Sequence, residues 1–274
     1  ENLVVDTSLF IVGSGRDATV IDGTQSGRVV DADGEIHVAM RDLRLTNGHD
    51  GNGSSPYGGG LYSGATSFVG VGLRIDHNSS VSLYGGAFLP GSSTLFDVIV
   101  DHNTAGMVGG LHTRGMVIDS LIADNSATES HCGGIQTDHA VLLRTKILRN
   151  SAHQEGGGGC GFAFVYHSTI AENTAEDGGG WGSTGLWFTN TTIAANHATA
   201  SGGALTDNQG ALQLHNCSVV SNTCGGDSCG SLDGSLALLT GTVIAENSPS
   251  NCSPSININD ESRCNLSDDS SCGF

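Results

Sequence analysis

Stretches of alternating apolar and polar residues recur along the chain, and they are rich in Val, Ile, Thr and Phe. Clear examples span residues 95–103, 117–125, 165–173 and 188–196. A period of two with this composition predicts β-strands. Each stretch ends on an asparagine that is usually followed by a small residue. This phrase returns eight times at intervals of 22 to 26 residues, at Asn78, Asn103, Asn125, Asn150, Asn173, Asn196, Asn222 and Asn247.

A glycine pair followed by a mostly apolar or small residue separates these phrases. The pairs with their following residue occupy 59–61, 85–87, 109–111, 133–135, 158–160, 179–181 and 202–204, and 229–232 (CGSL) takes their place in the last interval. A fixed period of this size indicates one structural unit stacked on itself. The 42 glycines among 274 residues leave little room for helices, because Gly weakens a helix interior.

Two or three short strands that close one turn in each interval predict the coil of a parallel β-helix, with neighbouring coils ~4.8 Å apart. Eight repeats and two looser coils before residue 50 predict about ten coils. We expect one elongated domain over 1–274, with irregular coils at 1–50, regular repeats at 51–248 and a cysteine-containing cap at 249–274. No linker separates a second domain.

The repeated residues predict an internal architecture. An asparagine at one corner of each coil tolerates left-handed torsions, and its amide can bond the equivalent amides above and below. We therefore expect an internal ladder from Asn103 to Asn247. The glycine pairs mark a corner that needs positive φ or close approach of the next coil. The residue three positions before each Asn is expected to stack in the core, at Ile122, Ile147, Ile170, Ile193, Val219 and Ile244.

Charge narrows the range of partners. The formal net charge is −18 and Lys146 is the single lysine, which argues against nucleic acid or an anionic membrane as partner. No apolar run approaches the ~20 residues that span a bilayer. Residue 1 starts in a strand-like segment without a signal peptide, so we expect a mature or truncated form of an exported protein.

Eight cysteines favour an oxidised, exported protein. The spacing lacks the paired Cys-x₂₋₄-Cys motifs of structural zinc. Cys224 and Cys229 bracket a short loop that a local disulfide could close, and Cys132 and Cys160 could link adjacent coils. At least two of the remaining candidates are expected to staple the cap, and these candidates are Cys252, Cys264 and Cys272.

The alternation of GGA or GGL with phrases such as FTN at 188–190 resembles the passenger repeats of polymorphic outer-membrane autotransporter proteins. The ending CNLSDDSSCGF is similar to the tails of secreted bacterial right-handed β-helix repeat proteins. The resemblance covers roughly residues 55–274 and implies a right-handed coil, a secreted or cell-surface location and adhesion as the function. Residues 1–274 depart from the autotransporter pattern, because we expect no membrane-barrel segment among them.

Right-handed β-helices also include polysaccharide lyases and hydrolases, which need a base with a cation or paired carboxylates. Alignment on the glycine pairs places His112 and Arg114 of one coil beside Asp138 of the next, with His139 following and His131 nearby. These four residues, His112, Arg114, Asp138 and His139, are the catalytic candidates. The alternative is that Arg114 and Asp138 form a surface ion pair of small energetic value.

Two other groups are binding candidates. Asp50, Asn52 and Ser54 offer oxygen atoms at alternate positions of a long coil and could hold Ca²⁺, although the closing Glu of an EF-hand loop is missing,. Trp181, Trp187 and Tyr166 are the candidates for an aromatic sugar-binding platform, whereas we expect Phe162 and Phe164 to be core residues.

The favoured function is therefore an exported binding or adhesion module for a carbohydrate or protein ligand. The alternative is a carbohydrate-active enzyme, a lyase or glycoside hydrolase of a neutral or weakly charged polysaccharide. A structural spacer is the third class. We expect no obligatory cofactor, with Ca²⁺ as the one candidate, and no nucleic-acid partner.

Overall fold

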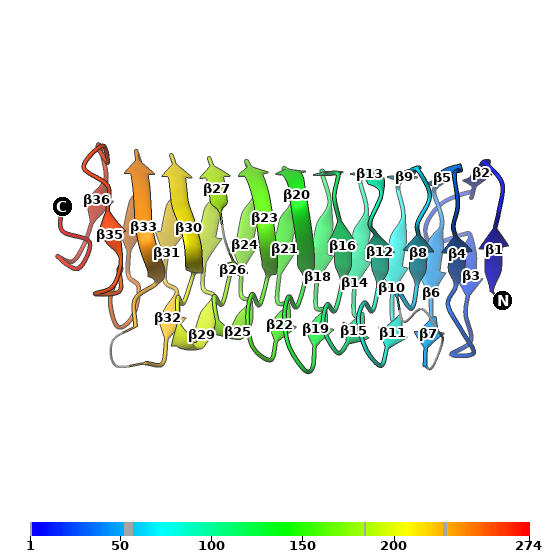
Figure 1. Ribbon diagram of the computed structural model, residues 1–274, viewed down its shortest axis with the longest axis horizontal. Coiled ribbons are helices and arrows are strands. Elements are labelled where there is room, and N and C mark those ends of the chain that lie inside the picture. Colours follow the sequence, from blue (N-terminus) through cyan, green and yellow to red (C-terminus); the bar gives the residue numbers. More distant parts are fainter. Residues whose placement is uncertain (1, 52–56, 184, 227–228) are drawn as a thin grey trace.

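The computed structural model describes residues 2–51, 57–183, 185–226 and 229–274. This part of the chain forms a parallel β-helix of about ten turns and contains no helix. The coils stack along one long axis, with the N-terminus at one end and the C-terminus at the other (Figure 1). The fold class predicted from the repeat is confirmed.

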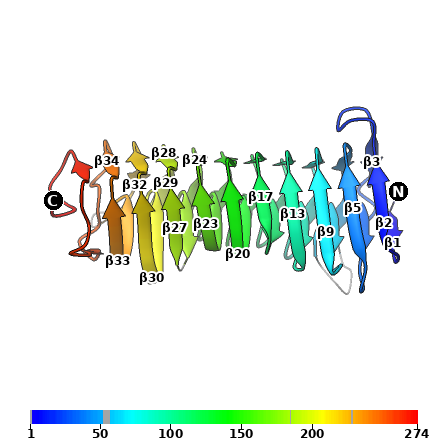
Figure 2. The same cartoon turned by 90° about the horizontal axis from the view of Figure 1, so that it is seen from above.

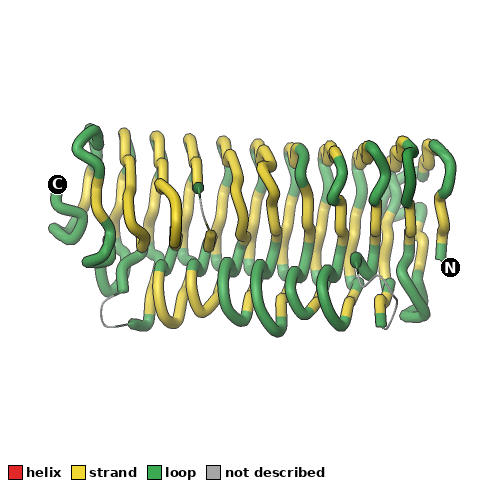
Figure 3. Tube along the Cα trace, in the orientation of Figure 1, coloured by secondary structure: helices red, strands yellow, loops and turns green. Residues whose placement is uncertain are grey.

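Three parallel sheets run the length of the stack. Sheet A has 17 strands, sheet B has 11 and sheet C has 8 among the described residues. Where a coil has a strand in sheet C, the chain passes from sheet A through a tight corner to sheet B, through a second corner to sheet C, and back to sheet A through a loop. Figure 3 shows these loops beside the short strands of sheet C.

The strands of sheet A are β1 (Leu3–Val5), β2 (Leu9–Val12), β4 (Val30–Ala32), β5 (His37–Arg41), β8 (Leu61–Ser63), β9 (Ser67–Val71), β12 (Ala87–Leu89), β13 (Ser92–Phe96), β16 (Leu111–Thr113), β17 (Met116–Ile118), β20 (Ile135–Leu143), β23 (Gly159–Tyr166), β26 (Trp181–Ser183), β27 (Leu186–Thr189), β30 (Leu205–His215), β33 (Leu232–Thr240) and β35 (Asn257–Ile258). Figure 2 views this sheet with its strands side by side.

The strands of sheet B are β3 (Val20–Asp22), β6 (Arg44–Thr46), β10 (Arg74–Asp76), β14 (Ile99–Asp101), β18 (Leu121–Ala123), β21 (Lys146–Leu148), β24 (Thr169–Ala171), β28 (Thr192–Ala194), β31 (Ser218–Val220), β34 (Val243–Ala245) and β36 (Leu266–Ser267). The strands of sheet C are β7 (His49–Asp50), β11 (Ser79–Ser80), β15 (Thr104–Ala105), β19 (Ser126–Ala127), β22 (Ser151–Ala152), β25 (Thr174–Asp177), β29 (His197–Ser201) and β32 (Thr223–Cys224).

The core is a set of rows of identical or similar side chains. Ile122, Ile147 and Ile170 pair in register in β18, β21 and β24, and all are at most 1% exposed. The row continues through Ile193, Val219 and Ile244. The predicted apolar stack is confirmed.

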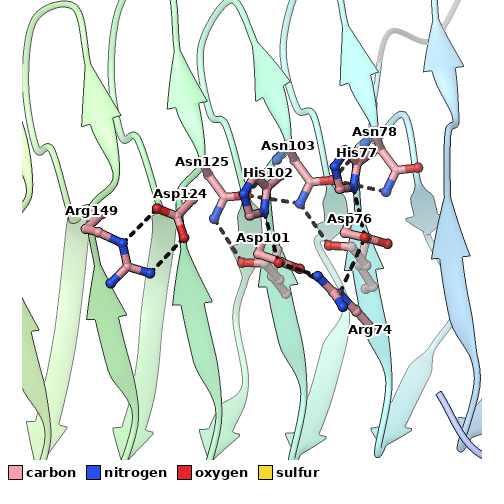
Figure 4. Close-up of polar contacts among 12 residues, drawn as sticks. Arg74, Asp76, His77, Asn78, Asp101, His102, Asn103, Asp124, Asn125 and Arg149 are labelled. Carbon is pink, nitrogen blue, oxygen red and sulfur yellow. Dashed lines mark hydrogen bonds and ion pairs between the residues drawn. The ribbon is translucent and has the colours of Figure 1, made fainter. Parts of the chain in front are cut away.

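The asparagine ladder forms as predicted and extends from Asn78 to Asn247. Asn125 is typical: its Nδ2 donates to Oδ1 of Asn150 at 3.0 Å and to the Val100 carbonyl at 2.9 Å. Its Oδ1 accepts the backbone N–H and the side-chain amide of Asn103. Figure 4 shows three successive members of the ladder.

The left-handed backbone torsion that was predicted for each ladder asparagine is found instead at the residue before it. The residue before each ladder asparagine has positive φ, for example His102 at 55° and Asp124 at 57°. The asparagines therefore direct their amides into the interior, and the left-handed neighbour makes the corner.

The glycine pairs serve close approach between coils. A Cβ on Gly110 would lie 2.4 Å from the Gly134 carbonyl oxygen, and one on Gly134 would lie 2.4 Å from that of Gly158. One glycine pair differs from the pair expected at the start of 158–160. Gly157 and Gly158 align with Gly179 and Gly180 of the next coil, in place of Gly158 and Gly159. Gly159 consequently takes a core position opposite Ile135 and Trp181.

Disulfides join Cys132 to Cys160, Cys224 to Cys229 and Cys252 to Cys272. The inter-coil link, the local loop and the stapled cap are therefore confirmed. Cys264 is a free, exposed thiol, so its assignment as a disulfide cysteine is wrong. Asp268 of the cap accepts the Glu246 N–H and an amide hydrogen of Asn251, so this acidic residue ends the ladder.

Replacement of Asn150 by Ala should lower the free energy of unfolding by about 2 kcal/mol or more, because the backbone N–H of Asn125 and the Ile122 carbonyl lose buried partners,. Urea unfolding followed by circular dichroism measures the change. Thr192→Ala on the exposed face of β28 is the control, and its effect should stay within about 0.5 kcal/mol. Equal stability of the two variants would contradict a structural ladder.

Candidate functional site

Sheet A brings three of the predicted catalytic residues together. His112 in β16 pairs with Gln136 in β20, which places Arg114 next to Asp138. Asp138 Oδ2 accepts a hydrogen bond from Arg114 Nε at 3.1 Å and lies 3.5 Å from His112 Nε2. The predicted convergence of base, cation and carboxylate is therefore present, while the catalytic role stays a prediction.

The three side chains differ in how much of their surface is exposed to solvent. The His112 side chain is 6% exposed, against 58% for Arg114 and 40% for Asp138. Burial lowers the pKa of His112; Arg114 acts in the same direction, and the Asp138 carboxylate opposes both. His112 is therefore held in the neutral form, in which an imidazole can accept or donate a proton. Its Nδ1 has no hydrogen-bond partner within the described structure.

His139 does not lie with the other three catalytic candidates, His112, Arg114 and Asp138. It has a left-handed φ of 65° at a bulge between Asp138 and Ala140. The bulge turns the imidazole toward the next coil, where it stacks on Phe162 with ring centroids 4.7 Å apart. His139 thus belongs to an aromatic surface, and among the described residues Asp138 forms its ion pairs with Arg114 and His112.

We call this surface the aromatic track; it consists of His139, Phe162, Phe164 and Trp187 on the outer face of sheet A. The ring centroids of Phe162 and Phe164 lie 5.1 Å apart, and those of Phe164 and Trp187 lie 5.2 Å apart. Both pairs of rings pack edge to face. Trp187 is 42% exposed. The expectation that Phe162 and Phe164 are core residues is wrong, because the alternating positions Ala163 and Val165 fill the interior instead. Tyr166 lies partly exposed on the same face as the two phenylalanines.

Trp181 does not bind a ligand from this surface. Its side chain is fully buried and its indole N–H donates to the Gly161 carbonyl at 3.1 Å. The physical reason is the missing side chain at Gly159 in the preceding coil, where a Cβ would lie 2.6 Å from the indole ring. Trp181 fills that space, so its assignment to the platform is wrong.

A second set of rings was missed by the sequence reasoning. We call it the aromatic stack: Tyr57, Tyr62, Tyr84, Phe88 and His112. Tyr62, Phe88 and His112 occupy the same position in β8, β12 and β16. Phe88 lies 4.3 Å from Tyr84 and 4.7 Å from His112. The available signal was the residue two places after each glycine pair, which is Tyr62, Phe88 or His112 in three successive repeats.

The aromatic stack and the polar group are electrostatically connected. Burial, together with the nearby Asp138 carboxylate, raises the pKa of Tyr84 to about 12. Tyr84 therefore stays protonated at neutral pH. Its ring packs against His112 with centroids 5.2 Å apart. His112 thus belongs to both the aromatic stack and the polar group, and Asp138 of the polar group pairs with Phe162 of the aromatic track.

The calcium candidates receive little support. Asp50 is buried, and its Oδ2 lies 3.3 Å from the Arg28 guanidinium. Asn52 and Ser54 lie outside the described residues. Within the described part of the chain, no group of three His, Cys, Asp or Glu side chains could hold a metal ion. Calcium binding at this loop stays a prediction.

Comparison of the chain with known protein families, curated proteins and solved structures gives no match. A membrane-spanning helix is also not found among the residues that the structure describes.

Trp181→Ala should lower the free energy of unfolding by about 3–5 kcal/mol, because it leaves a cavity in the core. Trp187→Ala, which removes the other indole from an exposed position, should cost under about 1 kcal/mol. Thermal and urea unfolding of the two variants measure this difference. A Trp187 variant as unstable as the Trp181 variant would contradict the placement of the aromatic track on the surface.

Proposed function

We propose that the protein is an exported, secreted or cell-surface binding module that recognises a carbohydrate through the outer face of sheet A. The observation that carries the proposal is the aromatic track, in which four ring side chains from three successive coils form one line of ring contacts. Outward aromatic side chains are not needed for the core, which the alternating inward residues already fill.

Sugar rings have apolar faces of C–H groups and rims of hydroxyls, so they pack on aromatic rings and hydrogen-bond to polar groups at the edge. The aromatic track offers the rings, and Arg114 and Asp138 offer the polar groups. The aromatic track crosses three successive coils that lie ~4.8 Å apart, which suits a chain of repeating sugars. The net charge of −18 favours a neutral or weakly charged polysaccharide,.

Export is supported by the three disulfides, which form and persist in oxidising compartments,. The resemblance of the repeats to secreted β-helix proteins and autotransporter passengers points in the same direction. A cell-surface adhesive role follows from this location together with the rod shape.

A carbohydrate-active enzyme is the second candidate, and one observation favours it. His112 is held neutral by burial beside a carboxylate and a guanidinium, which is a combination that proton abstraction or transfer can use. The substrate would lie over Asp138, because that carboxylate is the exposed member of the pair with His112.

A glycan-array screen of the oxidised protein should give carbohydrate hits, and Trp187→Ala and Phe164→Ala should weaken binding to them at least tenfold. Phe96→Ala is the matched control, because Phe96 is an aromatic residue of sheet A that is 44% exposed and lies outside the track. Equal loss in the Phe96 variant would indicate non-specific adhesion, and silence over the whole array would favour a structural spacer.

The enzyme candidate is tested by incubating each bound glycan with the protein and measuring new reducing ends or unsaturated products. Turnover that disappears in Asp138→Asn, while binding persists, would replace the binding module with an enzyme. For the binding module we expect no turnover, and unchanged affinity in the Trp187 variant would overturn the aromatic track as its site.

A further inference from the structure

The corner between sheets B and C carries a pair of stacked imidazoles. The left-handed residue before the ladder asparagine is a histidine in two successive coils, His77 and His102. Their ring centroids are 5.1 Å apart and their planes differ by 2°. The side chains are 51% and 50% exposed, and Figure 4 shows both above the buried carboxylates.

Each imidazole is oriented by a carboxylate. His77 Nδ1 lies 2.9 Å from Asp76 Oδ2, and His102 Nδ1 lies 3.0 Å from Asp101 Oδ2. A carboxylate accepts hydrogen bonds only, so Nδ1 carries the proton and the lone pair of a neutral ring is on Nε2. Within the described structure no hydrogen bond to either Nε2 is present. Both Nε2 atoms are therefore open to a ligand from solvent.

The carboxylates are fixed and already neutralised by arginines. Arg44 binds both oxygens of Asp76, and Arg74 binds both oxygens of Asp101 at 3.1 and 2.8 Å. Asp76 is fully buried, so Arg44 and His77 hold this carboxylate in one position. Two guanidiniums therefore balance the charges of the two carboxylates that face the imidazoles.

We propose that His77 and His102 bind a divalent transition-metal cation through their Nε2 atoms. A carboxylate that accepts the other ring N–H of the histidine is the usual support of a metal-binding imidazole, because it fixes the tautomer and the ring orientation. Imidazole ligands suit Zn²⁺ and Cu²⁺, whereas Mg²⁺ and Ca²⁺ prefer oxygen. The ring centroids are 5.1 Å apart and the rings are parallel, so the two rings must tilt toward each other for one cation to bind both Nε2 atoms at about 2.0–2.1 Å.

The protein supplies two ligands, and water completes the coordination. Asp124 occupies the equivalent position in the next coil, but Arg149 holds both of its carboxylate oxygens at 2.8 Å. Asp124 therefore does not count as a third ligand, in agreement with the lack of a three-residue metal group among the described side chains. The open positions make the pair a surface site that exchanges its metal with solvent.

Isothermal titration with ZnCl₂ and with CuSO₄ tests the proposal, in a Cys264→Ser background that removes the exposed thiol. We expect one strong site per chain, with Cu²⁺ bound more tightly than Zn²⁺. His77→Asn and His102→Asn, which keep a residue that tolerates left-handed φ, should each weaken binding at least tenfold. In the Cu²⁺ complex, electron paramagnetic resonance should show coupling to imidazole nitrogen that is lost in the double variant.

His167→Asn is the matched control, because His167 is an exposed, left-handed histidine at the other corner, with φ of 51°. The affinity of the His167→Asn variant for Zn²⁺ and Cu²⁺ should equal that of the parent protein. Unchanged affinity in the His77 and His102 variants would overturn the proposal. Titration with MgCl₂ that matches the zinc curve would also overturn it, because such binding would come from the acidic surface alone.

Discussion

The buried asparagine ladder is the interaction on which the rest of the structure depends. At the corner between sheets B and C, backbone N–H and carbonyl groups of each coil point into the interior, where a group without a partner costs about 1–3 kcal/mol. Asn125 shows how the ladder satisfies them: one amide binds the carbonyl of Val100, the amide of the next asparagine and the backbone N–H of Asn103. The ladder thereby fixes the corner and the register of neighbouring coils together.

The register between neighbouring coils then determines which side chains form rows on the outer surface. Because equivalent residues of successive coils lie one above the other, single outward positions become rows, such as the aromatic track and the stacked imidazoles of His77 and His102. The same stacking would place like charges together on a chain with a net charge of −18. Pairs such as Arg144 with Asp119 and Arg149 with Asp124 relieve this by joining opposite charges across adjacent coils.

A ladder must also end, and the cap supplies its last partners. Asn247 donates to Asn251, whose amide continues to Ser267 and Asp268. The disulfide between Cys252 and Cys272 holds this segment over the last coils. Asn251 and Asp268 of the cap therefore complete the hydrogen bonds of the interior.

The sequence by itself determined the fold, because a period of 22 to 26 residues is a stacking rule in which every repeat reports the same position,. It also determined that His112, Arg114 and Asp138 meet, since alignment on the glycine pairs gives the register directly. Only the tertiary structure decided which way individual rings point. Trp181 turns inward because Gly159 leaves a space in the neighbouring coil, and His139 turns along the sheet because a bulge adds one residue. Such placements depend on the shape of the adjacent coil, which the pattern within one repeat does not contain.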